Sequence, residues 1–278
     1  MKYIDLHVHS NASDGTYTPK ELVSLAKKSN IAAFALTDHD TVDGVETAII
    51  EGKKQNVEVI PAIELSAKYN GKEIHILGYG IDYKSEKLQR TLDEFEHIRN
   101  KRNEKIIERL QQQGFSITFE KIRELFPIGV ITRMHLAKYL VENSYVSSTE
   151  EAFDKYLGDR GCCFVPKEEI SVKEAIQCIL RNKGCPVLAH PMRYRLTENE
   201  LDKLVEECTT FGLIGIEAIY STNTWYDEQR TRQLANKYNL LITGGSDFHG
   251  ENKPHIKLGI GRGNLKIPYS ILANLKKH

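Results

Sequence analysis

The sequence predicts an α/β fold: a distorted (β/α)7 barrel with a helical insertion that caps the face formed by the carboxyl ends of its strands. Three observations support this prediction. Short apolar runs alternate with helical patterns, histidines and carboxylates end nearly every one of those runs, and a stretch near the middle contains helical patterns without a clear strand. Functional side chains of a (β/α) barrel collect at the carboxyl ends of its strands, so these polar endings favour a barrel over an open doubly wound sheet.

Seven runs rich in apolar or β-branched residues predict the strands. They lie at residues 3–8, 33–37, 57–60, 73–79, 186–190, 215–220 and 240–243. The predicted helices lie at residues 19–28, 42–55, 86–113, 172–182, 198–211, 226–238 and 268–276. The first helix opens with Thr18 as N-cap and Pro19 at its first position. Because strands and helices alternate, we expect a parallel sheet, and seven strands predict an incomplete or distorted barrel.

The middle of the chain predicts a second domain. Residues 100–170 have helical patterns, including 132–142 and 149–157. We therefore expect a barrel domain made of residues 1–99 and 171–278, and an inserted helical subdomain of residues 100–170. By analogy with the lids of other enzymes, the insertion is expected to cap the barrel mouth, and a long decorated connection is the alternative.

The composition excludes several classes of protein. The 278 residues carry 38 basic and 38 acidic side chains, so no net charge attracts the chain to a membrane or to long nucleic acid. No run reaches transmembrane length, and the first residues lack the apolar stretch of a signal peptide. The five cysteines lack metal-site spacing, and their odd number favours reduced thiols. A cytoplasmic protein is expected.

Two pairs of residues have the spacing of metal ligands. His7 and His9 alternate along the first predicted strand, while Asp247 and His249 follow two glycines that are expected to form a flexible turn. Side chains two residues apart on a strand project to one face, so each pair can chelate one ion. Asp5, on the same face, can orient an imidazole from behind. A lone His-x-His pair is more often structural than metallic, but two such pairs reverse that expectation.

Further candidate ligands lie in or just after other predicted strands. They are His39, Glu64, His75 and His190, with Asp14 in the loop after the first strand. Imidazoles and carboxylates without thiolates suit manganese, iron or zinc. The mixture predicts two or three divalent ions that share bridging carboxylates. Such a cluster lowers the pKa of water, supplies hydroxide near neutral pH and neutralises phosphate oxygens during in-line attack.

These strings together resemble a known family. They are Asp-Leu-His-Val-His with Ser-Asp-Gly from residue 5, Thr-Asp-His-Asp from residue 37, Ile-Glu-Leu-Ser from residue 63, His-Ile-Leu-Gly-Tyr from residue 75, Ala-His-Pro from residue 189 and Gly-Ser-Asp-Phe-His from residue 245. In this order they resemble the PHP (polymerase and histidinol phosphatase) family of metal-dependent phosphoesterases over essentially the whole chain. The resemblance implies a distorted (β/α)7 barrel of the PHP type with a trinuclear metal centre.

The resemblance also implies how the ligands divide among three ions. His7, His9, Glu64 and Asp247 would hold one ion; Asp14, His39 and His249 would hold a second; and Glu64, as a bridge, with His75 and His190 would hold the third. Manganese is favoured, with iron or zinc as alternatives. Some relatives have a histidine where this chain has Asp14, and this difference leaves the metal open because a carboxylate is a harder ligand. Asp38 and Asp40 are expected to support ligands or cap turns rather than bind an ion.

Four residues near the middle of the chain are candidates for binding a substrate phosphate: Arg99, Arg102, Asn103 and Arg133. Arg99 and Arg102 are neighbours that interrupt the apolar stripe of a predicted helix, so their burial would call for an anion, whose phosphate oxygens guanidinium groups match. The alternative is a roll of that helix that exposes them to water. Arg133 follows the N-cap Thr132, where free amides also attract an anion. The string Thr-Arg-x-His resembles the small-molecule and nucleotide phosphatase branch of the family, which implies phosphate contact by Arg133.

The leading interpretation is a metal-dependent phosphomonoesterase that hydrolyses a small phosphorylated metabolite, most of all a nucleotide such as AMP or a nucleoside 3′,5′-bisphosphate. Alternatives with the same chemistry are a histidinol-phosphate phosphatase and a 5′–3′ exonuclease on short oligonucleotides. A non-catalytic metal-binding module is less favoured, because structural metal sites are usually cysteine-rich cages, which this chain lacks. A carbon–nitrogen amidohydrolase is less favoured, because the Ser-Asp-Phe-His string fits a phosphoesterase better. Trp225 and Tyr226 follow a strand end, where they can either stack on a nucleobase or pack against the protein.

Overall fold

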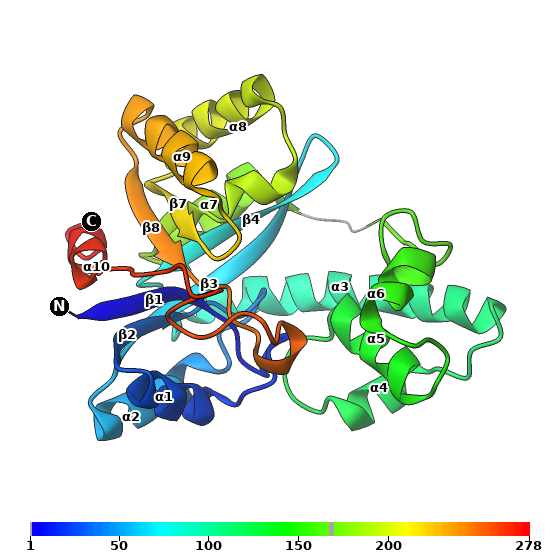
Figure 1. The fold of residues 1–278 in the computed structure, drawn as a ribbon. Helices are drawn as coiled ribbons and strands as arrows, with labels where there is room; N and C mark the ends of the chain where they lie inside the picture. The colour runs from blue at the N-terminus through cyan, green and yellow to red at the C-terminus, as the bar shows by residue number, and fades with distance from the viewer. Residues whose placement is uncertain (1, 167–169) are drawn as a thin grey trace. The chain divides into compact units, whose positions relative to one another are not determined.

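The computed structural model describes residues 2–166 and 170–278, so residues 167–169 of the predicted insertion lie outside the described residues. The chain divides into two compact units (Figure 1). One unit, the barrel unit, contains residues 2–89 and 170–278. The other, the helical unit, contains residues 90–166.

The barrel unit is built around seven strands in the order β1-β2-β3-β4-β6-β7-β8. Their bounds are β1 Tyr3–Val8, β2 Ile31–Leu36, β3 Glu58–Tyr69, β4 Lys72–Tyr79, β6 Cys185–Leu188, β7 Gly215–Tyr220 and β8 Leu241–Gly245, and a short β5, Ile170–Ser171, pairs with β3. Backbone hydrogen bonds join the first strand and the residue after it to the segment that follows the last strand. Among them, the amide of Asp247 donates to the carbonyl of His7 (2.9 Å), and the amide of His9 to the carbonyl of Phe248 (3.0 Å). The sheet is therefore a nearly closed barrel, which confirms the predicted fold class.

The expectation of a parallel sheet is wrong at β4, which runs antiparallel to both β3 and β6. β3 continues to Tyr69, well beyond the predicted 57–60, and turns back through Asn70 and Gly71. Both turn residues have positive φ, 48° and 80°, as a two-residue hairpin turn with the right twist requires. An Asn-Gly pair between apolar runs is a strong hairpin signal. A two-residue connection can join only antiparallel strands, because parallel pairing of β3 and β4 would need a long crossover.

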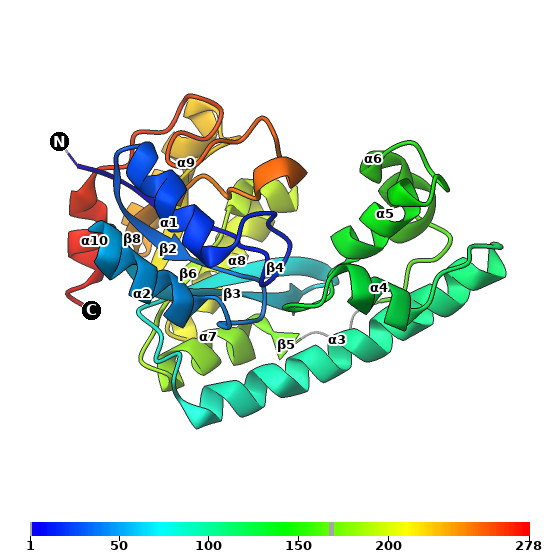
Figure 2. The same cartoon turned by 90° about the horizontal axis from the view of Figure 1, so that it is seen from below.

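Helices surround the strands. In the barrel unit they are α1 Pro19–Lys28, α2 Val45–Gln55, α7 Val172–Arg181, α8 Glu198–Thr210, α9 Trp225–Lys237 and α10 Tyr269–Leu275, with short 3-10 turns at Pro191–Tyr194 (η2) and Gly250–Asn252 (η3). α1 and α2 lie side by side (Figure 2). The predicted cap at Thr18 is confirmed, because its hydroxyl accepts from the amide of Glu21, whose carboxylate accepts from Thr18 in return. Apolar side chains of the barrel strands and α10 share one buried cluster.

The helical unit has its own core. α3, Glu86–Gln112, begins before the boundary between the units and is followed by α4 Phe119–Leu125, α5 Arg133–Glu142, α6 Thr149–Ala152 and a π-helical turn, Phe153–Leu157. Ile106, Leu110, Leu136 and Leu140 are fully buried in it. Among the described residues, no helix combines the length and apolar character needed to cross a membrane.

Candidate metal centre

The structure brings all nine predicted metal ligands together in the barrel unit. They come from β1 (His7), β3 (Glu64) and β4 (His75), and from the segments after β1 (His9 and Asp14), β2 (His39), β6 (His190) and β8 (Asp247 and His249). They form four overlapping groups whose ligand atoms lie within 4.8 Å of one another: His9, Asp14, His39 and His249; His7, Glu64 and His190; His7, His9 and Asp247; and His39, Glu64 and His75. The antiparallel β3–β4 hairpin places Glu64 and His75 beside ligands from the parallel strands.

Glu64 is the centre of this arrangement. Its Oε2 lies 3.2 Å from Nε2 of both His7 and His9, and 3.3 Å from Nδ1 of His39. Its Oε1 lies 2.9 Å from Nδ1 of His75 and 3.1 Å from Nε2 of His190. One buried carboxylate thus faces five imidazoles, a position suited to a bridging ligand.

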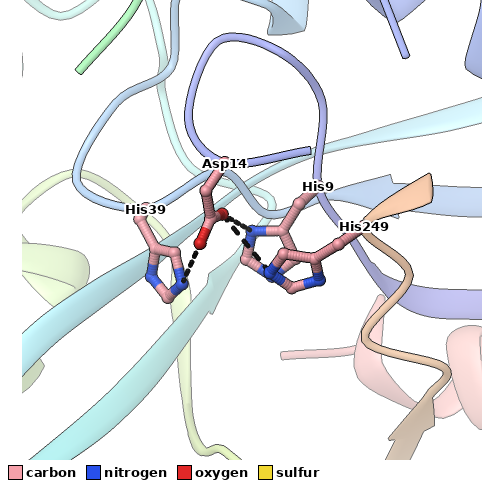
Figure 3. Close-up of side chains that lie close together, drawn as sticks. All are labelled: His9, Asp14, His39 and His249. Carbon is pink, nitrogen blue, oxygen red and sulfur yellow. Dashed lines mark ion pairs between the residues drawn. The ribbon is translucent and has the colours of Figure 1, made fainter. Parts of the chain in front are cut away.

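Asp14 organises a second group, which Figure 3 shows. Its Oδ1 lies 3.3 Å from Nε2 of His249 and 3.7 Å from Nδ1 of His9, while its Oδ2 lies 3.9 Å from Nε2 of His39. The rings of His9 and His249 are stacked with centroids 4.0 Å apart. His9 therefore stands between this group and the one around Glu64.

Several candidate ligand atoms are buried without a hydrogen-bond partner in the described part of the chain, as expected for atoms that bind a cation. Nε2 of His7, both ring nitrogens of His9 and Oε2 of Glu64 are buried and make no hydrogen bond within the described residues, although they lie close together. Buried polar atoms without a partner cost free energy, so this set calls for a charge placed among them. Imidazole and carboxylate donors suit divalent manganese, iron or zinc, and the overlap of the four groups fits more than one ion.

The electrostatics of the centre separate its imidazoles into two kinds. Burial lowers the pKa of His190 to about 4 and holds that of His39 well below its usual range. Burial also opposes protonation of His9 and His75, but nearby carboxylates outweigh it, Asp247 and Glu64 for His9 and Glu64 for His75, so both pKa values rise to about 9. A metal ion at these two imidazoles must therefore displace protons.

Glu217, on β7, contacts two of the candidate ligands, a role that was not predicted from the sequence. Its Oε1 lies 3.0 Å from Nδ1 of His7, and its Oε2 accepts a 2.8 Å hydrogen bond from the amide of His190. It is fully buried. A carboxylate behind an imidazole fixes the ring so that the other nitrogen faces the metal. A single glutamate in an otherwise apolar strand, Gly-Ile-Glu-Ala-Ile-Tyr, is the signal that could have revealed it.

Three more residues that the sequence analysis did not predict surround Oδ2 of Asp247. The hydroxyl of Tyr220 and the ammonium of Lys253 each donate to it over 2.6 Å, and Arg193 lies 3.6 Å away while it also donates to Tyr220. Burial would raise the pKa of Asp247, but Lys253 and the neighbouring imidazoles hold it well below its usual range. The other oxygen, Oδ1, lies 3.4 Å from Nε2 of His9. Asp247 thus stays ionised, with one oxygen toward the ligand cluster.

Two expectations about supporting residues need correction. Asp5 orients no imidazole: its side chain accepts from the amide and hydroxyl of Ser246 and from the amide of Gly259, so it positions the segment that carries Asp247. The glycines before Ser246 form no flexible turn, because they belong to β8. A Cβ at Gly245 would lie 2.2 Å from that of His7, so only glycine allows this close approach.

Asp38 and Asp40 are placed as expected, as supports rather than ligands. Asp38 accepts from the hydroxyls of Ser10 and Ser13, both over 2.6 Å, and so holds the loop that carries Asp14. Asp40 accepts from the amide of Ser66 over 2.8 Å. Neither belongs to any of the four ligand groups.

The four predicted phosphate-binding residues all lie in the helical unit, where three of them are buried. Arg99 and Arg102 are each 7% exposed and Asn103 is 1% exposed, so the alternative of a solvated helix face does not hold for them. Nε of Arg102 donates to the carbonyl of Val165, and Nδ2 of Asn103 to that of Ile131, both over 2.8 Å. Arg102 and Arg133 both lie 5.9 Å from the centre of the Phe164 ring. The structure thus gathers these cations inside one unit and gives some of their donors structural partners.

The comparison with known proteins agrees with this geometry. Residues 5–207 match the model of the PHP domain. The chain belongs to the PHP family. A solved amidohydrolase from Chromobacterium violaceum, with bound sulfate and no metal, superimposes on this PHP protein with a TM-score of 0.88 at 27% identity, over 99% of this chain and 96% of that chain. It shares the nearly closed seven-stranded barrel.

Named relatives cover nearly the whole PHP protein. It is 35% identical to the 5′-3′ exoribonuclease of Haemophilus influenzae over 89% of this chain and 90% of that protein. It is 34% identical to the 5′-3′ exoribonuclease Rnm of Escherichia coli, over 92% and 87%. It is 30% identical to the 3′,5′-nucleoside bisphosphate phosphatase of Chromobacterium violaceum, over 90% and 88%. With its buried ligand cluster, the PHP protein is therefore a metal-dependent phosphoesterase.

The contact between Glu217 and His7 gives a first testable prediction. Glu217→Gln should lower the affinity for divalent metal about 10- to 100-fold, because a neutral amide no longer polarises the imidazole. Competition with a chelator, read by elemental analysis, measures this change. Glu200→Gln, at the exposed start of α8, is the matched control. Equal affinities in both variants would show that Glu217 does not support the centre.

Proposed function

We propose that this protein removes nucleotides from the 5′ end of short oligoribonucleotides by metal-dependent hydrolysis of phosphodiester bonds. The observation that carries the proposal is similarity at 34–35% identity, over about nine tenths of both chains, to two 5′-3′ exoribonucleases. The preference for a phosphomonoesterase gives way to this alternative. Neutral net charge is compatible with short strands, because avid binding of long strands requires many basic contacts.

The nine ligands would hold the ions. We propose that Glu64 bridges between ions, that His7, His9 and Asp247 complete one site, Asp14, His39 and His249 a second, and His75 and His190 a third. In the observed groups His9 also lies next to Asp14, so it stands at the border of two sites. Divalent ions in such a centre lower the pKa of water and neutralise the oxygens of a phosphate.

Cationic side chains would bind the anionic substrate. In the barrel unit, Arg193 is half exposed and Lys253 partly exposed beside Asp247, where each can reach a phosphate oxygen. In the helical unit, we propose that Arg99, Arg102, Asn103 and Arg133 bind a phosphate group. Guanidinium groups match phosphate oxygens, which an oligonucleotide offers at each linkage.

A second candidate is hydrolysis of nucleoside 3′,5′-bisphosphates. It is favoured by the relative of that name from Chromobacterium violaceum. The same ligand centre and the same cations would serve this reaction, in which a phosphomonoester replaces the phosphodiester. Histidinol phosphate, with one phosphate and a cationic amine, makes no use of several arginines.

One assay separates these functions. The purified protein, loaded in turn with Mn²⁺, Fe²⁺, Zn²⁺ or Mg²⁺, is incubated with a 5′-phosphorylated RNA pentamer, adenosine 3′,5′-bisphosphate, AMP and histidinol phosphate. We expect stepwise release of mononucleotides from the 5′ end of the pentamer. Phosphate release from the bisphosphate with an intact pentamer would favour the second candidate, and turnover of histidinol phosphate alone would overturn both.

Arg133 provides a prediction about substrate binding. Arg133→Ala should raise KM for the pentamer about tenfold, because one charge-assisted contact to a phosphate is lost, and should leave the metal content unchanged. Steady-state kinetics and elemental analysis of the same sample give both values. Arg160→Ala, at an exposed arginine of the same unit, is the control. An unchanged kcat/KM in the Arg133 variant would remove that residue from the substrate site.

A further inference from the structure

We propose that Trp225 and Tyr226 form a stacking platform for the bases of a single-stranded RNA whose 5′ end lies at the metal centre. The proposal rests on the proposed function and adds where the rest of the strand binds. Trp225 is 77% exposed and Tyr226 63% exposed, so neither packs in the core. Large exposed aromatic side chains mark binding surfaces, and these two line the same groove.

The platform lies on the same face of the barrel as the metal centre. Tyr220, the last residue of β7, donates to Asp247, and Trp225 begins α9 five residues later. Five residues of chain span at most about 18 Å, a distance that a few nucleotides cover. The segments that follow parallel barrel strands share the face on which ligands gather. The chain topology therefore keeps the aromatic pair close to the reacting end of a bound strand.

A groove continues from the aromatic pair between α8 and α9. Its volume of about 710 Å³ is in the range of ligand-binding clefts. Besides Trp225 and Tyr226, its lining includes the amide side chains of Asn199, Gln229 and Gln233. These amides both donate and accept hydrogen bonds, as base edges and ribose hydroxyls require. The two helices that form the groove are seen in Figure 1.

The charges of the groove favour stacking over phosphate contact. Glu198 lies 3.6 Å from Arg230, and Asp202 lies 2.7 Å from Lys237, so each acidic group has a basic partner. A groove with paired charges attracts phosphates weakly, whereas stacking on an aromatic ring is available to every base. We therefore expect the contribution of the platform to tolerate sequence and to depend only weakly on salt.

The single tryptophan of the chain makes the platform directly observable. The metal-loaded protein is titrated with a phosphorothioate RNA pentamer that resists hydrolysis, and both tryptophan fluorescence and the anisotropy of a labelled pentamer are followed. We expect the fluorescence to be quenched over the same concentration range as the anisotropy rises. A dinucleotide should quench less than the pentamer, because fewer of its bases reach Trp225.

Variants test the energetic role. Trp225→Ala should weaken pentamer binding roughly tenfold or more, with a smaller loss for a dinucleotide, whereas Trp225→Phe should retain most of the affinity because it keeps a stacking ring. Ile50→Ala, which removes an exposed apolar side chain from α2, is the matched control. Circular dichroism and metal content establish that each variant is folded.

The outcomes separate this proposal from the proposed function. Hydrolysis of the pentamer with no quenching and no effect of Trp225→Ala would overturn the platform and leave the exonuclease intact. Absence of both pentamer binding and pentamer hydrolysis would overturn the two together. A self-association, measured by sedimentation, that Trp225→Ala abolishes would instead assign the aromatic pair to a contact between copies of this chain and overturn the platform.

Discussion

Replacing Glu64 with glutamine is expected to reduce hydrolysis by on the order of a thousandfold. Glu64 faces five imidazoles, with Oε2 3.2 Å from Nε2 of His7 and Oε1 3.1 Å from Nε2 of His190, so its loss affects every group that contains it. An amide has the same shape but no charge, and its nitrogen cannot bind a cation. The measurements are the steady-state rate on the RNA pentamer and the number of metal ions per chain.

The loss of activity should result from weaker metal binding and not from unfolding of the chain. Glu51→Gln, at a partly buried position of α2, makes the same chemical change away from the ligand cluster and should keep full activity. The Glu64 variant should lose metal while its far-ultraviolet circular dichroism stays like that of the unmodified protein. A fully metallated and active Glu64 variant would refute its role as a shared ligand.

Removal of the metal is expected to abolish activity and to lower Tm. Ions that bind only the folded chain stabilise it by mass action, by about 2.7 kcal/mol when the free ion is at 100 times its Kd. Dialysis against a chelator, followed by calorimetry, measures the stability change, and adding back each metal identifies which ions restore turnover. An unchanged Tm and full activity after verified removal would contradict a metal-dependent mechanism.

The same centre predicts how metal affinity depends on pH. In the absence of an ion, His9 and His75 have pKa values of about 9, so both imidazoles carry protons at neutral pH. Each must lose its proton before it can donate to a cation, so the apparent affinity should fall as the pH decreases below about 9. Calorimetric titration in buffers of different ionisation enthalpy measures the protons released.

The sequence alone predicted which residues gather at the candidate centre, because they lie in or just after predicted strands. A strand alternates its faces and a barrel gathers strand ends, so His7, His9 and Asp247 could be assigned to one place from spacing and order. Because the candidate ligands are imidazoles and carboxylates without thiolates, the sequence already favoured manganese, iron or zinc. The Asn70–Gly71 pair is a hairpin signal in the sequence, but the strand–helix alternation of the rest of the chain favours a parallel sheet.

Only the tertiary structure revealed the support that Glu217 gives to the candidate ligands and the actual role of Asp5. Glu217 lies far from His7 in the sequence, and Asp5 contacts Ser246 across the closure of the barrel, so no local pattern links these partners. The exposure of Trp225 could not be predicted either, because an aromatic residue after a strand end suits a core as well as a binding surface. Spacing along the chain determines which face a side chain occupies, whereas contacts between distant segments depend on how the strands close.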